Sequence, residues 1–240
     1  DVASKFFEHF VAITTSMNEI GAVGLWDDED GFYYDLLHSG PKMIRLKLRS
    51  MVGLLPLIAV EFLDETLLEK VPAFRKRMDW FIANRPHLSK HLERRGKSVL
   101  LALATRERLK RILHRLLDPN EFLSPYGIRS MSKAHENDPF VLSLKGQHYR
   151  VGYEPGESQT PLFGGNSNWR GPIWFPVNYL LIGALEQYHK FYGTSLKVPN
   201  LDGKAGSLTL HQVAHQIRGR LVKLFLPDAQ GVRPSHRSCP

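Results

Sequence analysis

The chain has 240 residues, 42% of them hydrophobic and 23% charged, which is the composition of an ordinary globular protein with one sizeable core. Its single cysteine, Cys239, excludes an internal disulfide framework, and we therefore expect a reducing, cytoplasmic location. No apolar run approaches the roughly 20 residues of a membrane-spanning helix, so we expect no membrane partner.

The formal net charge of +8 is concentrated in residues 75–115, which hold 13 Lys or Arg and 3 Asp or Glu. A basic stretch of this kind can bind nucleic acid. Binding to single strands also uses interleaved aromatic side chains, and here only Trp80 and Phe81 are available. We therefore expect solvated helix faces and no nucleic-acid partner, and we keep a basic nucleic-acid-binding helical protein as the third alternative.

The first predicted element is an amphipathic helix from Val2 to Ile20, because apolar residues recur there at three- and four-residue spacing. Turn signals at residues 30–31 and 38–41 then flank an aromatic run. They predict a β-hairpin that pairs residues 32–37 with residues 43–48. The helix face expected to be buried consists of Val2, Phe6, Phe10, Ile13, Met17 and Ile20.

The middle of the chain carries two further helical patterns before it becomes irregular. Residues 52–63 are apolar almost throughout, with a proline near the first turn, which predicts a buried helix. A helix is also expected over residues 71–83, followed by a short strand at 98–104 and an amphipathic helix at 106–117. The core positions expected in the 71–83 helix are Phe74, Trp80 and Phe81.

Residues 119–165 show little helical periodicity, and a connection this long is usually functional or built of local strands. Arg129 could face a substrate or brace its own loop, and both alternatives stay open from the sequence. His135 and His148 have no partner spacing typical of a zinc site, so neither a metal nor another cofactor is expected. The remaining elements expected are strands at 140–144 and 147–153 and helices at 177–192 and 208–226.

A polar, glycine-rich and aromatic loop, residues 164–174 (GGNSNWRGPIW), precedes the 177–192 helix. Glycines allow tight turns and close approach to a ligand. Trp169 and Trp174 offer flat apolar faces, and Arg170 offers a rigid set of hydrogen-bond donors. A sugar has C–H bonds on its face and hydroxyls at its edge, so this mixture suits a sugar. The alternative is a turn whose tryptophans anchor the core.

A second candidate segment, residues 26–35, contains Trp26 and five acidic residues. A carboxylate accepts strong hydrogen bonds, so Asp35 above all is a candidate contact for sugar hydroxyls. The alternatives are a solvated acidic turn or a cation-binding loop, although the spacing of the carboxylates does not fit an EF-hand.

Residues 168–174 resemble the tryptophan-arginine-glycine-proline loop of glycoside hydrolase family 63, which includes processing α-glucosidases and mannosylglycerate hydrolases. Residues 26–35 and 49–56 agree with two more stretches of the family in order, and residues 124–132 are similar to a fourth. The resemblance implies an (α/α)6 toroid of helical hairpins around a carbohydrate site. We therefore expect a mainly α fold, an incomplete toroid with a small β-hairpin and irregular loops at one end. Residues 1–240 would form part of that single domain, truncated at both ends.

The same resemblance implies an inverting hydrolase acting on α-linked glucosides, related oligosaccharides or mannosylglycerate. Its catalytic acid is expected upstream of Asp1 and its base beyond Pro240, so no catalytic residue is expected in the chain, which should be inactive alone. The alternative is a non-catalytic carbohydrate-binding remnant. The substrate-binding residues implied are Trp169, Arg170, Trp174, Trp26 and Asp35.

Overall fold

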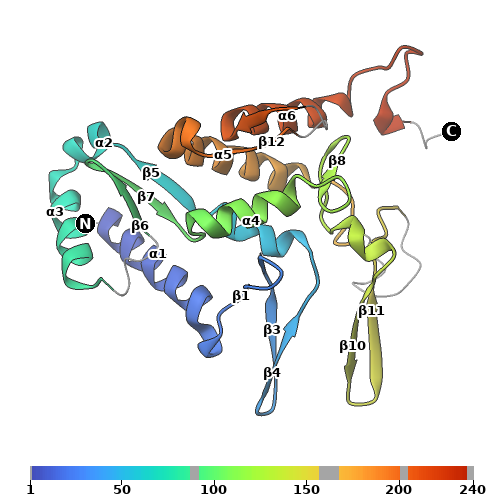
Figure 1. Cartoon of the computed structure of the whole chain (residues 1–240), viewed down its shortest axis with the longest axis horizontal. Helices are drawn as coiled ribbons and strands as arrows, with labels where there is room; N and C mark the ends of the chain where they lie inside the picture. The colour runs from blue at the N-terminus through green and yellow to red at the C-terminus, as the bar shows by residue number, and fades with distance from the viewer. Residues whose placement is uncertain (1, 87–91, 157–167, 201–204, 237–240) are drawn as a thin grey trace.

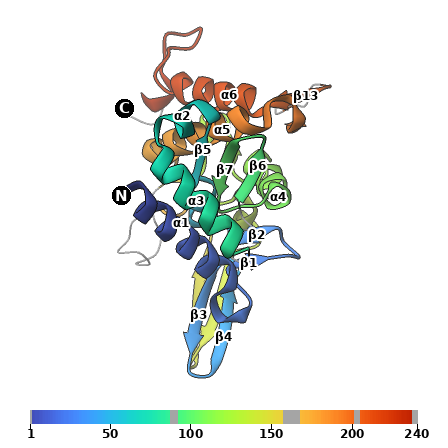
Figure 2. The ribbon, with the colours of Figure 1, turned by 90° about the vertical axis from the view of Figure 1, so that its left-hand side faces the viewer.

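The computed structural model describes residues 2–86, 92–156, 168–200 and 205–236. Figure 1 shows α5 and α6 side by side along one edge of the molecule, with α4 running beneath them. Helices α1 to α3 lie at the opposite end, across a three-stranded sheet, and Figure 2 shows α1 and α3 packed together there. The α-helices are α1 (Val2–Glu19), α2 (Glu65–Lys70), α3 (Pro72–Asn84), α4 (Arg106–Leu116), α5 (Phe175–Tyr192) and α6 (Leu210–Lys223).

The expectation of a mainly α, incomplete toroid is wrong. Besides its helices, the described part of the chain forms six small sheets, so the fold mixes helix and strand throughout. The clearest departure is at residues 52–63, where a helix was predicted. A short 3-10 helix, Met51–Leu57, ends just after Pro56, and the chain continues as strand β5 (Val60–Leu63). Because β5 pairs with β7 (Ser98–Ala102), which also pairs with β6 (Leu92–Arg95), tertiary pairing overrides the apolar helical pattern.

The predicted hairpin exists in shifted form. Strand β3 (Asp35–Ser39) pairs with β4 (Lys42–Leu46), and Gly40 supplies the positive φ of 60° at the turn. Residues 32–33 instead form β2 and pair with β1 (Trp26–Asp27). The predicted strands at 140–144 and 147–153 are confirmed as β10 (Phe140–Leu144) and β11 (Gln147–Val151). Both long hairpins project in the same direction from the body of the molecule (Figure 1, Figure 2).

Two further pairs of short antiparallel strands lie in the loops of the second half of the chain. Strand β8 (Leu123–Ser124) pairs with β9 (Gly127–Ile128), and β12 (Lys197–Pro199) pairs with β13 (Ser207–Thr209). The second pair leads directly into α6, whose first turn carries a capping box between Thr209 and Gln212. The local sequence therefore fixes where α6 begins, inside the predicted span of 208–226.

The main core lies between α4, α5, α6 and the 3-10 helix. The apolar face predicted for α4 is confirmed, because its four residues are fully buried. Phe32 and Phe122 stack with ring centroids 5.7 Å apart and connect this face to the loops. The α4 face consists of Leu109, Ile112, Leu113 and Leu116.

A smaller core lies under α1 and α3, where Phe7 makes edge-to-face contacts with Phe74 and Phe81. Phe74 and Phe81 were predicted in the core and are buried, whereas Trp80 is 58% exposed and its predicted core position is wrong. The predicted face of α1 is confirmed only in part, because Phe10 and Met17 are half-buried against the cores while the fully buried stripe has mixed polarity. Its buried residues are Ser4, Phe7, Val11 and Thr14, and its exposed apolar residues include Val2, Phe6 and Ile13.

Among the described residues, no helix combines the length and apolar character that a membrane crossing requires.

Candidate functional site

Three loops that are far apart in the sequence are joined by backbone hydrogen bonds into one array. The amide of Met51 donates to the carbonyl of Ser130 at 2.8 Å, and the amide of Ser132 donates to Arg49 at 2.9 Å. The amide of Ser130 in turn donates to the carbonyl of Pro172 at 3.0 Å. The segments 49–56, 124–132 and 168–174, singled out separately in the sequence, therefore meet in space.

Glycines allow these segments to approach closely. Gly171 has φ of 142°, and a Cβ there would lie 2.5 Å from the ring of Tyr153. Its amide donates to Ser130 Oγ at 2.9 Å, which fixes the loop to the array. Gly53 admits the fourth segment, because a Cβ at this position would lie 2.2 Å from Phe32. Both glycines are therefore required by packing, apart from any contact with a ligand.

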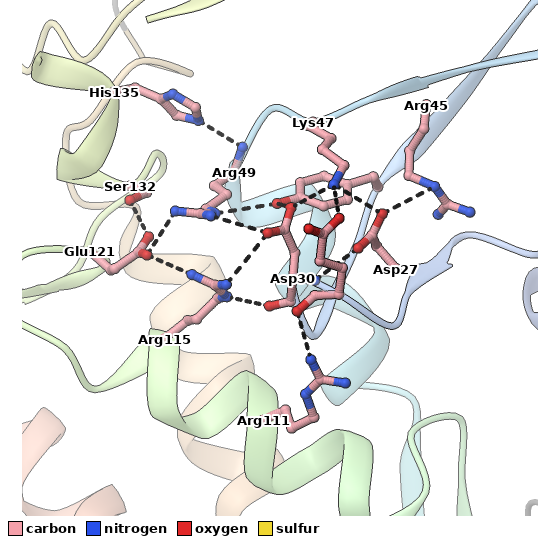
Figure 3. Close-up of polar contacts among 12 residues, drawn as sticks. Asp27, Asp30, Arg45, Lys47, Arg49, Arg111, Arg115, Glu121, Ser132 and His135 are labelled. Atoms are coloured by element: carbon pink, nitrogen blue, oxygen red, sulfur yellow. Dashed lines mark hydrogen bonds and ion pairs between the residues drawn. The ribbon is translucent and has the colours of Figure 1, made fainter. Parts of the chain in front are cut away.

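Glu121 is the centre of a network of charged groups that supports the array (Figure 3). It is only 8% exposed, and its Oε1 accepts from Arg49 Nη1 at 2.9 Å and from Arg115 Nη1 at 2.8 Å. The hydroxyl of Ser132 donates to its other oxygen. A buried carboxylate needs this pairing to remain charged, so Glu121 acts as a brace between α4 and the loops.

The same network binds the acidic segment 26–35. Tyr34 donates to Asp30 Oδ2 at 3.0 Å and accepts from Arg49 Nε at 3.2 Å. Lys47 lies between Asp27 and Asp30, 3.4 Å and 3.3 Å from their carboxylate oxygens. Figure 3 shows Lys47 and Arg49, from the segment just after β4, directed toward Asp27 and Asp30 of the acidic turn. The segment is therefore a cross-linked turn, and its cluster of carboxylates is neutralised by basic neighbours.

The pKa shifts fit this bracing role. Burial raises the pKa of Asp30, but hydrogen bonds from Tyr34 and Lys47 and the nearby cations outweigh it, so the net pKa is lowered. Burial raises the pKa of Tyr34 to about 12, despite the opposing effect of Arg49. At neutral pH, Asp30 is therefore an ionised acceptor and Tyr34 a neutral donor. Neither group is suited to exchange a proton in catalysis.

His135 and Arg129 also serve the loops. The amide of Arg49 donates to His135 Nε2 at 2.9 Å, which requires the other nitrogen, Nδ1, to carry the proton that it donates to the carbonyl of Asp138. Arg129 Nη1 lies within 3.1 Å of three backbone carbonyls, and its Nε donates to Tyr153 Oη. Of the two alternatives left open for Arg129, the geometry supports the brace.

The structure brings three of the predicted sugar-binding residues together. Trp169 and Trp174 have ring centroids 4.6 Å apart with the planes inclined at 55°, and Trp169 is 37% exposed. Arg170 is 1% exposed and its Nη1 pairs with Glu154 Oε2 at 2.9 Å, while its carbonyl accepts from the amide of Glu154. Trp169 therefore lies near the surface, Trp174 packs half-buried against the main core, and Arg170 is buried. The first part of the predicted loop, Gly164 to Ser167, lies outside the described residues.

The other two predicted residues lie elsewhere. Trp26 is 4% exposed, and its Nε1 donates to Asp28 Oδ1 at 2.7 Å. Its ring packs against Tyr33 and beneath the guanidinium of Arg108, so in this structure it is part of the core. Asp35 is exposed at the start of β3 and lines a cavity of about 250 Å³. Tyr34, Ser50 and Gly53 also line this cavity, which places it against the loop array.

Residues 97–201 match the model of the glycosyl hydrolase family 63 C-terminal domain. The predicted resemblance is thereby confirmed, over a range that includes α4, Glu121 with its partners Arg115 and Ser132, and the Trp169–Trp174 pair.

Two curated relatives extend the comparison. An uncharacterized protein of Saccharomyces cerevisiae is 44% identical over 255 residues, covering 98% of this chain and 23% of the relative. A probable mannosyl-oligosaccharide glucosidase of Schizosaccharomyces pombe is 37% identical over 80 residues, covering 33% of this chain and 7% of the relative. The chain thus spans less than a quarter of the length of either relative.

Within the family 63 segment, sequence reasoning missed Asn178 and Glu121. Asn178 is 1% exposed in the first turn of α5, where its Oδ1 accepts from the amide of Ile128 at 2.7 Å. Its Nδ2 donates to the carbonyls of Ile128 and Trp174, so it ties the aromatic loop to β9. A polar residue within an apolar helical stripe was the available signal for Asn178. Glu121 had no such signal, because its partner Arg49 is 72 positions away.

Within the described ranges, no three His, Cys, Asp or Glu side chains are grouped so that they could hold a metal ion.

Proposed function

We propose that this chain supplies the sugar-holding surface of an inverting family 63 hydrolase acting on α-linked glucosides or related oligosaccharides. The observation that carries the proposal is the pair of near-surface Trp169 and half-buried Trp174 within the family 63 segment. The name of the fission-yeast relative, a probable mannosyl-oligosaccharide glucosidase, supports the choice of a glucose-containing oligosaccharide.

The pair is suited to hold a sugar because its position is fixed before a ligand arrives. Gly171 is bonded to Ser130, Arg170 is paired with Glu154, and Asn178 holds the carbonyl of Trp174. A rigid aromatic surface loses little conformational freedom on binding the C–H face of a sugar ring. Arg170 then acts as a positioning residue, since its buried guanidinium holds the loop on which Trp169 stands.

Asp35 would supply a polar contact. Its exposed carboxylate stands at the mouth of a largely apolar cavity, and a carboxylate binds hydroxyl groups strongly. Ser50 lines the same cavity, and Tyr34 contributes its ring to the lining while its hydroxyl is held between Asp30 and Arg49.

Catalysis by inversion requires a pair of carboxyl groups about 6.5–9.5 Å apart, one of them with a raised pKa. The carboxylates of the loop array do not meet this requirement, because Glu121 is bound between two arginines and the pKa of Asp30 is lowered. As the family resemblance implies, we propose that the catalytic acid and base lie outside these 240 residues. The second candidate function is that of a non-catalytic carbohydrate-binding protein, which would use the same aromatic pair but have no catalytic acid and base.

A binding and turnover comparison tests the proposal. The 240-residue chain should bind maltohexaose, an α-linked glucose oligosaccharide, and should bind cellohexaose, its β-linked counterpart, at least about tenfold more weakly. It should not hydrolyse an aryl α-glucoside. Equal binding of the two oligosaccharides, or no binding of either, would overturn the assigned substrate class. Turnover by the chain alone would overturn the assignment of the acid and base.

A further inference from the structure

A second groove lies on the outer face of α5, where α5, α6 and the start of β5 come together. It has a volume of about 350 Å³, within the range of about 300–1,000 Å³ that small-molecule sites occupy. Tyr179 lies on its wall and is 76% exposed, although most of the other large apolar side chains of α5 are buried in the core. An aromatic side chain this exposed on an ordered helix is a candidate binding surface.

The groove beside Tyr179 is open at Gly183. Gly183 follows one helical turn later, on the same face of α5, and a Cβ built there would have no heavy atom within 4 Å. The absence of a side chain at this position leaves room for a ring to lie along the helix next to the tyrosine. The rest of the apolar lining consists of Ile58, Val60, Leu180, Ile182 and Ala184.

Polar groups stand one further turn along the groove, and their partners hold them in place. The carboxylate of Glu186 lies 2.7 Å from His211 Nδ1 and 3.6 Å from Arg218 Nη2, both on α6. Gln187 Nε2 donates to Glu61 Oε1 at 3.4 Å. A guanidinium has five N–H donors and a carboxylate several acceptor positions, so Glu186 and Arg218 retain capacity for a ligand. The Arg218 side chain is 52% exposed, which leaves it accessible.

We infer that this groove is a further carbohydrate-binding site, which takes one or two sugar units of an oligosaccharide. Tyr179 would stack on the sugar face, and Glu186 and Arg218 would bind its hydroxyls. The choice of carbohydrate as the ligand rests on the proposed function, whereas the existence of a site rests on the groove itself. The Trp169–Trp174 pair stands on the loop before α5 and lines no part of this groove.

A residue-resolved titration tests the inference. Maltohexaose is added to the isotopically labelled 240-residue chain, and backbone amide shifts are followed by NMR. Amides of residues 179–187 should titrate, and Tyr179→Ala should raise their dissociation constant at least about tenfold. Tyr179→Phe should keep the affinity within about twofold, because the ring face makes the contact. Trp80→Ala, which removes an exposed aromatic side chain from α3, is the matched control and should have no effect.

Two results would overturn the inference. One is an absence of shifts at residues 179–187 at maltohexaose concentrations that saturate the 168–174 amides. The other is a titration that Tyr179→Ala leaves unchanged. Loss of the 168–174 response alone would count against the proposed function and leave the groove intact, so the two failures are distinguishable. If Tyr179→Ala instead lowers self-association in sedimentation without changing the sugar titration, the groove is an interface between copies of the chain and not a sugar site.

Discussion

The two segments with the richest aromatic and polar composition, residues 26–35 and 168–174, have opposite environments in the fold. Trp26 is 4% exposed and lies beneath Arg108, while Trp169 is 37% exposed beside Trp174. In the first segment the carboxylates of Asp27 and Asp30 are ion-paired with Arg45 of β4 and Arg115 of α4. In the second the single charge, Arg170, is buried. The same residue types therefore brace the fold in one loop and, in the other, form the surface that we propose binds sugar.

The largest expected effect concerns Trp26. Replacing it with alanine removes a buried aromatic side chain and should lower the free energy of unfolding by about 3–5 kcal/mol. Trp169→Ala removes a partly exposed ring and should cost about 1 kcal/mol or less. Urea unfolding followed by circular dichroism measures both values. Similar losses for the two variants would abolish the distinction between the segments.

The second prediction concerns Glu121 and its two arginines. Glu121→Ala leaves Arg49 and Arg115 without their shared partner in a largely buried site, and we expect a loss of about 3 kcal/mol. Glu136→Ala is the matched control, because its ion pair with Lys133 is exposed and should contribute about 0–1 kcal/mol. If both variants unfold at the same urea concentration as the parent chain, the network does not hold the loops.

A smaller effect is expected from pH. Because the pKa of Asp30 in the folded chain is lowered from its usual 3.8, the group stabilises the fold above about pH 4. That stabilisation is lost as the pH falls through the lowered pKa. Asp30→Asn should therefore be less stable than the parent at pH 7, and the difference should shrink below about pH 4. Thermal melts of the parent and Asp30→Asn at pH 7, 5 and 3 measure this difference in stability. A difference that grows in acid would contradict the lowered pKa of Asp30.

Local patterns predicted the elements whose contacts are nearby in the sequence. The α4 face could be predicted because Leu109, Ile112 and Leu113 bury a regular helical stripe. The buried face of α1 could not be predicted in this way. Contacts with Phe74 and Phe81 bury Phe7, whereas Phe6, which belongs to the longer apolar stripe, is exposed. The helix predicted at residues 52–63 was wrong for a related reason, since strand β5 forms there by pairing with the distant strand β7.

The candidate site was predictable to the extent that its residues are adjacent. Trp169 and Trp174 are five positions apart and were expected to act together. Their separation from Trp26 was not visible, because the burial of Trp26 depends on Arg108 of α4. The exposed position of Asp35 in a cavity likewise depends on residues as distant as Ser50 and Leu103.

The most direct test of the account is the affinity of the 240-residue chain for maltohexaose, measured by calorimetry for the parent, Trp169→Ala and Trp80→Ala. We predict that Trp169→Ala weakens binding at least about tenfold, with a melting temperature close to that of the parent, and that Trp80→Ala binds like the parent. An unchanged affinity for Trp169→Ala would contradict the account, and the Trp169–Trp174 pair would then be a packing feature of the loop.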